Sequence, residues 1–203
     1  ESSIKYNPNP LTISLTAFYN YSPYYHQMNQ MGECLNEPDP NSDSHPCAGA
    51  DFIDWSTGLY KYKIKGVKAL IKGLEFNLRY NYKNFKIIYD FSLTRGDDLT
   101  NNSPLSYINP DKQIMILEYQ KELMNYKFRL SRTHSQDRLG EFETYTPSAF
   151  LVDFIIGYSR NSQSVTVQFN NVLNEEYYNH LSRIKSIMPE AGRNIAINYK
   201  ILF

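Results

Sequence analysis

The chain has 203 residues, with 21 basic and 21 acidic residues and therefore no formal net charge. A chain without a basic excess is a poor candidate for nucleic-acid binding, and no apolar run approaches the ~20 residues that a transmembrane helix needs. The mean hydropathy is negative, which is typical of soluble proteins but is also compatible with a transmembrane barrel, because only alternate residues of its strands face lipid.

Eight segments alternate between apolar and other residues with the period of two that predicts β-strands. In chain order they are residues 11–19, 74–82, 85–93, 115–120, 126–131, 149–160, 164–170 and 194–203. Residues 58–66 also alternate, and we expect them to be the upper part of the strand that continues through residue 81. Tyrosine is unusually frequent, with 18 residues, and suits a membrane interface. A Tyr-rich soluble β-sandwich remains an alternative, since its strands also bury one face.

The connections between these segments alternate between short and long. The short ones are residues 82–84, 122–125 and 161–162, and the long ones are residues 22–66, 96–111, 136–148 and 174–191. Strands of about nine to twelve residues, with tight turns at one end and long loops at the other, are typical of outer-membrane barrels. With a periplasmic C-terminus, every long connection would be extracellular. The pattern therefore favours an all-β fold, an antiparallel transmembrane β-barrel segment of about eight strands.

The end of the chain resembles the C-terminal end of a TonB-dependent outer-membrane receptor. The terminal strand closes on an aromatic residue, and the resemblance covers residues 168–203. The motif residues that carry it are Asn171, Asn174, Tyr177, His180, Gly192, Arg193, Asn194 and Phe203. Several of them also have a structural reading, because Asn favours turns and Gly192 allows a conformation that other residues resist.

The resemblance implies a 22-stranded barrel with an N-terminal plug domain inside it, of which residues 1–203 would be the C-terminal portion and residues 22–66 a long extracellular loop. It implies a location in the outer membrane of a Gram-negative bacterium. The expected partners are the plug and the remaining strands, TonB acting through the plug, outer-membrane lipid and the barrel assembly machinery, but no nucleic acid. The implied function is active uptake of a metal or metal chelate, such as copper or an iron siderophore.

Two other classes of protein stay open. A standalone small barrel with a structural or adhesin role predicts that residues 11–21 pair with residues 192–203. An outer-membrane enzyme predicts a Ser/His pair within hydrogen-bond reach, and His134 lies near Ser131, Thr133 and Ser135 in the sequence. No nucleophile, metalloprotease or phosphate-loop motif is present, so we expect no enzymatic activity.

The loop at residues 22–66 contains both cysteines, Cys34 and Cys47. In an oxidising environment two cysteines at this spacing predict a disulfide, which would be worth ~3 kcal/mol in the chain-entropy model. His26, Met28 and Met31 precede them, and thioether and imidazole groups suit copper. A metal site formed by these three residues is the alternative role for the loop.

Cationic residues also gather before the last strand, where Arg183 and Lys185 follow His180. Cations at the mouth of a receptor would attract an anionic iron chelate. An ordinary solvated loop is the simpler interpretation of the same residues.

Overall fold

The computed structural model describes residues 1–32, 34, 47–141 and 143–202, so Phe203, the expected aromatic end of the last strand, lies outside the described residues. No helix in these ranges is long and apolar enough to cross a membrane. The strands within them are β1 (Ser2–Tyr6), β2 (Leu11–Gln30), β3 (Ile53–Asp54), β4 (Leu59–Tyr60), β5 (Tyr62–Tyr82), β6 (Phe85–Asp98), β7 (Ser103–Pro104), β8 (Lys112–Lys121), β9 (Met124–Thr133), β10 (Ala149–Arg160), β11 (Gln163–Asn170) and β12 (Asn194–Ile201).

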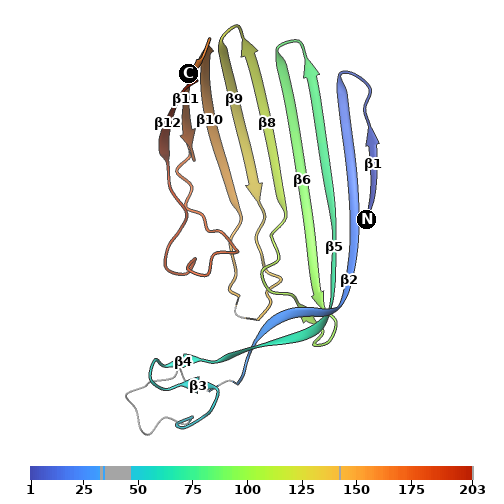
Figure 1. Cartoon of the computed structure of the whole chain (residues 1–203), viewed down its shortest axis with the longest axis vertical. Helices are drawn as coiled ribbons and strands as arrows, with labels where there is room; N and C mark the ends of the chain where they lie inside the picture. The colour runs from blue at the N-terminus through green and yellow to red at the C-terminus, as the bar shows by residue number, and fades with distance from the viewer. Residues whose placement is uncertain (33, 35–46, 142, 203) are drawn as a thin grey trace.

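One large antiparallel sheet contains all of these strands except the β3–β4 hairpin. Its order is β1-β2-β5-β6-β8-β9-β10-β11-β12, with the short β7 paired to β6 (Figure 1). The order follows the chain, and β1 and β12 form its two ends. Residues 11–21 therefore pair with β1 and β5, and the closure onto residues 192–203 that a standalone barrel predicts is wrong for the described residues. The sheet is an open strip of barrel wall.

The eight predicted segments fall in strands, the last of them as far as Ile201. The predicted continuation of residues 58–66 into the strand through residue 81 is confirmed from Tyr62, where β5 begins. Strand β2 extends further than predicted. The pairing of β2 and β5 runs from Leu11 opposite Tyr80 to Gln30 opposite Tyr62. The connection between β2 and β5 is thus residues 31–61, so residues 22–30 of the predicted loop 22–66 belong to a strand. The prediction missed these residues because of a β-bulge between Ser22 and Tyr25, where Pro23 interrupts the ladder. The extra residue reverses the alternation of β2, so its second half does not continue the apolar pattern.

The connections differ sharply between the two ends of the sheet (Figure 1). Three hairpins close with two-residue turns, and the first residue of each has a left-handed backbone: Lys83 at φ 52°, Glu122 at φ 50° and Asn161 at φ 52°. This conformation suits tight hairpins. Together with the turn at residues 7–10, they occupy one end of the sheet, and the connections 31–61, 99–111, 134–148 and 171–193 occupy the other.

The long-connection end carries a projecting arm, formed by residues 22–30 of β2, residues 62–69 of β5 and the β3–β4 hairpin (Figure 1). A small apolar core fixes its base: Val67 and Ala69 pack with Leu105 of the β6–β8 connection. Tyr25, beyond the bulge, packs against the same core. The rest of the sheet is a single layer in which apolar side chains such as Ile197 (72% exposed) have no protein cover among the described residues.

Candidate functional site on the polar face of the sheet

The strand register gives the sheet two chemically different faces. Residues directly opposite each other in neighbouring strands share a face. One row across the outward face consists of Ile13, Leu78, Tyr89, Met115, Leu130 and Val152. The adjacent row on the inward face consists of Ser14, Asn77, Asp90, Ile114, Ser131 and Leu151. One side of the strip is therefore continuously apolar and the other is mostly polar.

The apolar face is bounded at both ends. At the short-turn end lies an aromatic belt, in which the rings of Phe85 and Tyr119 are 4.6 Å apart and those of Tyr119 and Tyr126 are 6.3 Å apart. At the other end Lys72 and Arg95 oppose each other on the same face. The ten residue steps from Tyr82 to Lys72 span roughly 33 Å along the strand, which at a tilt of about 40° is a height of about 25 Å. That is the height of the lipid-facing band of outer-membrane barrels.

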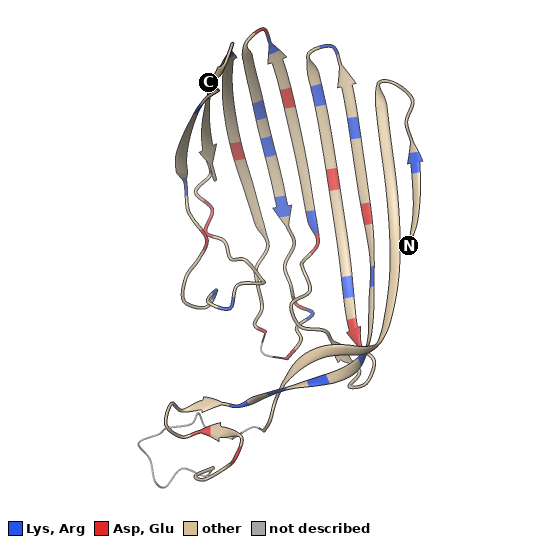
Figure 2. Ribbon diagram, viewed as in Figure 1, with Lys and Arg blue, Asp and Glu red and all other residues tan. Residues whose placement is uncertain are grey.

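The inward face carries charged residues that neutralise one another across strands. The Glu118 carboxylate lies 2.8 Å from the Lys127 ammonium and 3.6 Å from that of Lys86, and Arg129 lies 3.7 Å from Asp153. Figure 2 shows charged residues along β5, β6, β8, β9 and β10, whereas β2 carries no Lys, Arg, Asp or Glu. Exposed pairs of this kind add little stability, but they make the inward face a polar wall.

A pocket of about 600 Å³ lies where the inward face meets the long connections. We call it the rim pocket, and its lining includes Glu75, Lys112, Tyr177, Tyr178, His180 and Glu190. Strand residues thus form its floor, while residues 177–181 of the β11–β12 connection form its wall. Lys112 also lines two further hollows of the inward face. It is an exposed cation at the centre of the hollowed region.

Carboxylates of the β9–β10 connection fasten the other long connections around this pocket. Glu141 accepts hydrogen bonds from the Gln30 backbone N–H (3.0 Å) and from the Asn29 amide (2.8 Å), both in the arm. Glu143 accepts the backbone N–H groups of Tyr107 (2.7 Å) and Gly140 (2.8 Å). These two side chains therefore connect the β9–β10 connection to the arm and to the β6–β8 connection.

The β11–β12 connection joins the same assembly through His180, whose side chain is fully buried. Its Nε2 lies 3.0 Å from Glu143 Oε1, and its Nδ1 lies 2.9 Å from Thr146 Oγ1. The Lys185 ammonium donates to Thr146 Oγ1 and to the Thr144 carbonyl, both at 2.6 Å, and lies 3.3 Å from His180 Nδ1. We call Glu143, Thr146, His180 and Lys185 the rim network.

Burial shifts the pKa of two residues of the rim network, His180 and Lys185. Loss of water lowers the pKa of His180, Glu143 opposes this effect, and the nearby Lys185 ammonium reinforces it. Burial likewise lowers the pKa of Lys185, with Glu143 opposing. The interpretation of residues 180–185 as an ordinary solvated loop is wrong for His180 and for Lys185, because both are held by the β9–β10 connection. Arg183 instead lies over the Tyr107 ring, 5.3 Å from its centre.

The motif residues meet at the base of the β11–β12 connection. The buried Asn171 side chain accepts the Glu175 N–H (2.9 Å) and donates to the Glu175 carbonyl (2.8 Å), while its backbone N–H donates to Asp153 (2.9 Å). Asn174 accepts the Arg193 N–H at 3.0 Å. Asn194 donates to the Gly192 carbonyl at 2.9 Å. The start and end of the connection are thus tied together by structural contacts, while Tyr177 lines the rim pocket and the His180 ring is buried beside it.

The predicted metal ligands do not converge on this pocket. His26 and Met28 lie opposite Gly66 and Ile64, so both are on the outward side of the arm. Met31 follows the end of β2 and is 52% exposed. Within the described ranges no cluster of three or more His, Cys, Asp or Glu residues has metal-site geometry. The copper site at His26, Met28 and Met31 stays a prediction. It would lie on the arm, away from the inward face.

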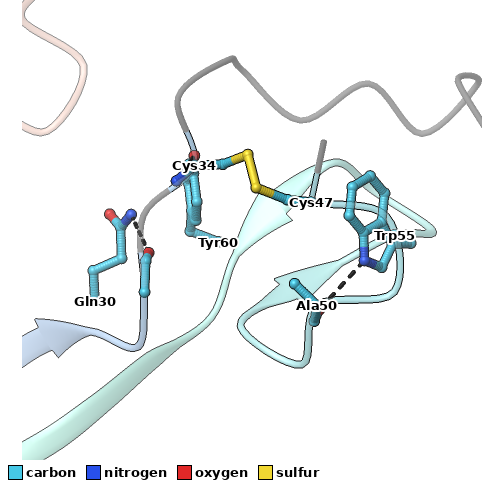
Figure 3. Close-up of a disulfide and its surroundings, with 7 residues drawn as sticks. Gln30, Cys34, Cys47, Ala50, Trp55 and Tyr60 are labelled. Carbon is cyan, nitrogen blue, oxygen red and sulfur yellow. Dashed lines mark hydrogen bonds between the residues drawn. A yellow bond between two sulfur atoms is a disulfide. The ribbon is translucent and has the colours of Figure 1, made fainter. Parts of the chain in front are cut away.

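Cys34 and Cys47 form a disulfide, with their Cα atoms 6.2 Å apart (Figure 3). The Cys34 backbone N–H donates to the Tyr60 hydroxyl at 3.3 Å, which attaches the bridge to β4. The Trp55 indole, in the turn between β3 and β4, donates to the carbonyl of Ala50, which precedes β3, at 3.3 Å (Figure 3). Oxidised cysteines are poor metal ligands, so the bridge is a covalent cross-link within the arm and does not contribute thiolate ligands.

His134, the candidate base of the enzyme alternative, lies at the rim beside Gln113, with 3.1 Å between the His Nε2 and the Gln amide nitrogen. In the described part of the chain its side chain forms no hydrogen bond to a Ser or Thr hydroxyl. The nucleophile–base pair that an enzyme needs is not assembled at this position.

The polar inward face, the bounded apolar band and the end-to-end difference in connections define the chain as a strip of outer-membrane-type barrel wall. The chain belongs to the TonB-dependent receptor family: the family model described as TonB dependent receptor-like, beta-barrel, matches residues 1–174. This family comprises outer-membrane transport receptors of Gram-negative bacteria. The matched residues include the arm, the carboxylates Glu141 and Glu143 of the β9–β10 connection, and the motif residues Asn171 and Asn174.

Solved structures share the fold at low identity. A copper transporter, OprC, superposes with a TM-score of 0.78 at 14% identity, and the FrpB iron transporter from Neisseria meningitidis with 0.70 at 13%. The ferripyoverdine receptor of the Pseudomonas aeruginosa outer membrane, bound to ferripyoverdine, gives 0.63 at 18%. Each alignment covers 98% of this chain, which spans 30%, 30% and 26% of those chains, respectively. No curated protein matches the chain in sequence.

Proposed function

We propose that this chain is the wall and rim of an outer-membrane active-transport receptor that takes up a metal or a metal chelate, copper or an iron siderophore. The observation that carries the proposal is the rim pocket, which opens on the polar inward face directly beside the long connections. In this arrangement the long connections are extracellular, the short turns and the C-terminus are periplasmic, and cargo meets Lys112 and Tyr177 before passing inward.

The uncovered sheet edges and the inward charges support a larger assembly. β1 and β12 each have one strand neighbour, and an unpaired edge in lipid is costly. Further barrel strands, making 22 in all, would pair with them. A plug domain against the inward wall would meet Glu75, Arg79 and Asp90, and TonB would act through that plug. Similarity to a copper transporter and to iron transporters supports metal cargo without separating the two metals.

Lys112 suggests how an anionic chelate would be attracted. Its ammonium is exposed on the hollowed inward face, and a fixed charge in a concave site raises the local concentration of oppositely charged ligand. We expect Lys112→Gln to raise the half-saturating chelate concentration several-fold, with an effect that shrinks at high salt. Lys83→Gln, at a short turn on the opposite end, is the matched control and should leave uptake unchanged.

Cellular metal accumulation tests the function. The full receptor is expressed in a metal-starved Gram-negative host that lacks its own receptors, with and without TonB, and copper and iron (free and siderophore-bound) are supplied separately. TonB-dependent accumulation of one of them would support the proposal and identify the cargo. Equal accumulation with and without TonB for every metal would refute it. Replacement of Met28 and Met31 by Leu tests the arm site, since unchanged copper retention by the purified receptor would eliminate it.

A further inference from the structure

The rim network is a buried, titratable contact between two long connections. His180 comes from residues 171–193, and Glu143 and Thr146 come from residues 134–148. Glu143 also holds the β6–β8 connection through the Tyr107 N–H, and Glu141, two residues earlier, holds the arm. Glu143 and His180 therefore join three of the long connections, and Glu141 ties the arm to the same segment.

The contacts define which protonation state of His180 the folded rim requires. Lys185 donates to Thr146 Oγ1, so the Thr146 hydroxyl proton is available for His180 Nδ1. Nδ1 is then an acceptor, and the ring proton lies on Nε2, facing the Glu143 carboxylate. This is the neutral imidazole, whose Nδ1 accepts from Thr146, while its Nε2 lies 3.0 Å from Glu143 Oε1 without the geometry of a hydrogen bond.

A second proton on His180 would fall on Nδ1, which lies 3.3 Å from the Lys185 ammonium. The charged groups acting on the ring are Glu143, from the β9–β10 connection, and Lys185, from its own connection. Glu143 would attract the new charge and Lys185 would repel it, in a site where the ring has no contact with water. Protonation would also remove the acceptor that Thr146 uses.

We infer that the packing of His180 against Thr146 and Glu143 is a proton-sensitive latch, which holds the β11–β12 connection over the rim pocket when His180 is neutral and releases it when His180 is protonated. Residues 177–181 wall the rim pocket, so release enlarges its mouth. All of the latch residues lie in the connections 134–148 and 171–193 of this chain. The operation of the latch does not depend on which metal is carried or on TonB.

The pH window follows from the direction of the shift. Because burial holds the folded-state pKa of His180 below the value of about 6.5 for an exposed imidazole, the neutral latch contributes its full stability above that value. The contribution is lost as the pH falls through the folded-state pKa. We therefore expect a closed rim at pH 7.5 and a loosened rim near pH 5.

Hydrogen–deuterium exchange of the purified full receptor in lipid nanodiscs at pH 7.5 and pH 5 tests the latch. Rates are divided by those of an unstructured reference peptide to remove the intrinsic pH effect. We expect peptides covering 134–148 and 171–193 to exchange at least 10-fold faster at pH 5, while peptides of β8 to β10 stay unchanged. A wild-type rim that is equally protected at both pH values overturns the inference without any variant.

Three substitutions identify the titrating group. His180→Gln stays neutral and should reduce the pH response of the rim to less than twofold, and Lys185→Gln should weaken it because the repulsion is removed. His134→Gln, at another rim histidine that contacts Gln113, is the matched control and should keep the full response. A full response in His180→Gln, or its loss in His134→Gln, would assign the effect to another group and overturn the latch.

Discussion

A single charge placed on either face of β5 separates the lipid-facing interpretation from that of a soluble sheet. Leu78 lies in the middle of the outward band, six residues from Lys72 and four from Tyr82. Its neighbour Asn77 points inward, beside Asp90, to which it donates a hydrogen bond. We compare Leu78→Arg with Asn77→Arg, because the two variants add the same side chain at adjacent positions of one strand.

The expected difference is large. An arginine on the lipid face near the bilayer centre costs about 2–4 kcal/mol in outer-membrane barrels. At residue 77 the new guanidinium meets the Asp90 carboxylate in a polar surrounding, where an exposed pair changes stability by less than about 1 kcal/mol. Leu78→Arg should therefore destabilise the receptor by at least about 1 kcal/mol more than Asn77→Arg.

Urea unfolding of the full receptor in phosphatidylcholine vesicles, followed by tryptophan fluorescence and by heat-modified gel mobility, measures this difference. Both variants must show the same dependence of unfolding free energy on urea as the wild type, so that only stability has changed. Equal losses in the two variants, or a greater loss in Asn77→Arg, would show that the outward face does not meet lipid.

Three further outcomes follow from individual contacts. Gly73→Ala should destabilise the receptor by about 1–3 kcal/mol, because the added Cβ would meet the Leu93 carbonyl and the Phe18 ring. Gly157→Ala is the control in the same urea assay and should be neutral, because its added Cβ would have its nearest contact at 3.7 Å. Reduction of the disulfide should speed proteolysis within the β3–β4 hairpin but leave the urea midpoint unchanged. Asp153→Ala should cost about 1–3 kcal/mol and accelerate amide exchange at Asn171, because it removes the carboxylate that accepts the Asn171 N–H at 2.9 Å.

The architecture was predictable because it depends on local alternation. Every one of the eight segments became a strand, and the disulfide and the contrast between short and long connections are present as predicted. The prediction from alternation failed where the alternation of faces is interrupted or the strand is very short. The bulge at Ser22–Tyr25 reversed the faces of β2, and β1 has only five residues, too few for a clear pattern.

The rim was not predictable, because its contacts join residues that are distant in the chain. Glu141 and the Asn29 amide are 112 residues apart, and His180 and Thr146 are 34 residues apart. Nothing in the local sequence distinguishes these carboxylates from solvated ones. The only signal was His180 within the family motif, and it does not reveal that the ring is buried. Likewise, the proximity of His26 and Met28 in sequence did not reveal that they face outward from the arm.

The exposed surface of the chain leads to a final prediction about its stability by itself. A compact monomer of this mass, 23.8 kDa, exposes about 9,900 Å², whereas this chain exposes 13752 Å². The buried apolar core of the described residues is correspondingly small, consisting of Ile53, Val67, Ala69, Leu70, Leu105 and Ala149. The exposed surface is thus roughly 1.4 times that of a compact monomer, and exposed apolar side chains of the outward face and of the edge strand β12 contribute to it.

Without lipid and the rest of a barrel, these 203 residues should not fold cooperatively, because the buried apolar area is too small to offset the conformational entropy of ordering the sheet. The test is urea titration of the isolated chain in detergent-free buffer, monitored by near-ultraviolet circular dichroism, next to the full receptor in vesicles. A gradual, featureless titration is expected for the isolated chain. A sharp transition with the urea dependence of a 200-residue domain would mean that the outward apolar face finds cover within the chain, and the lipid-facing assignment would fail.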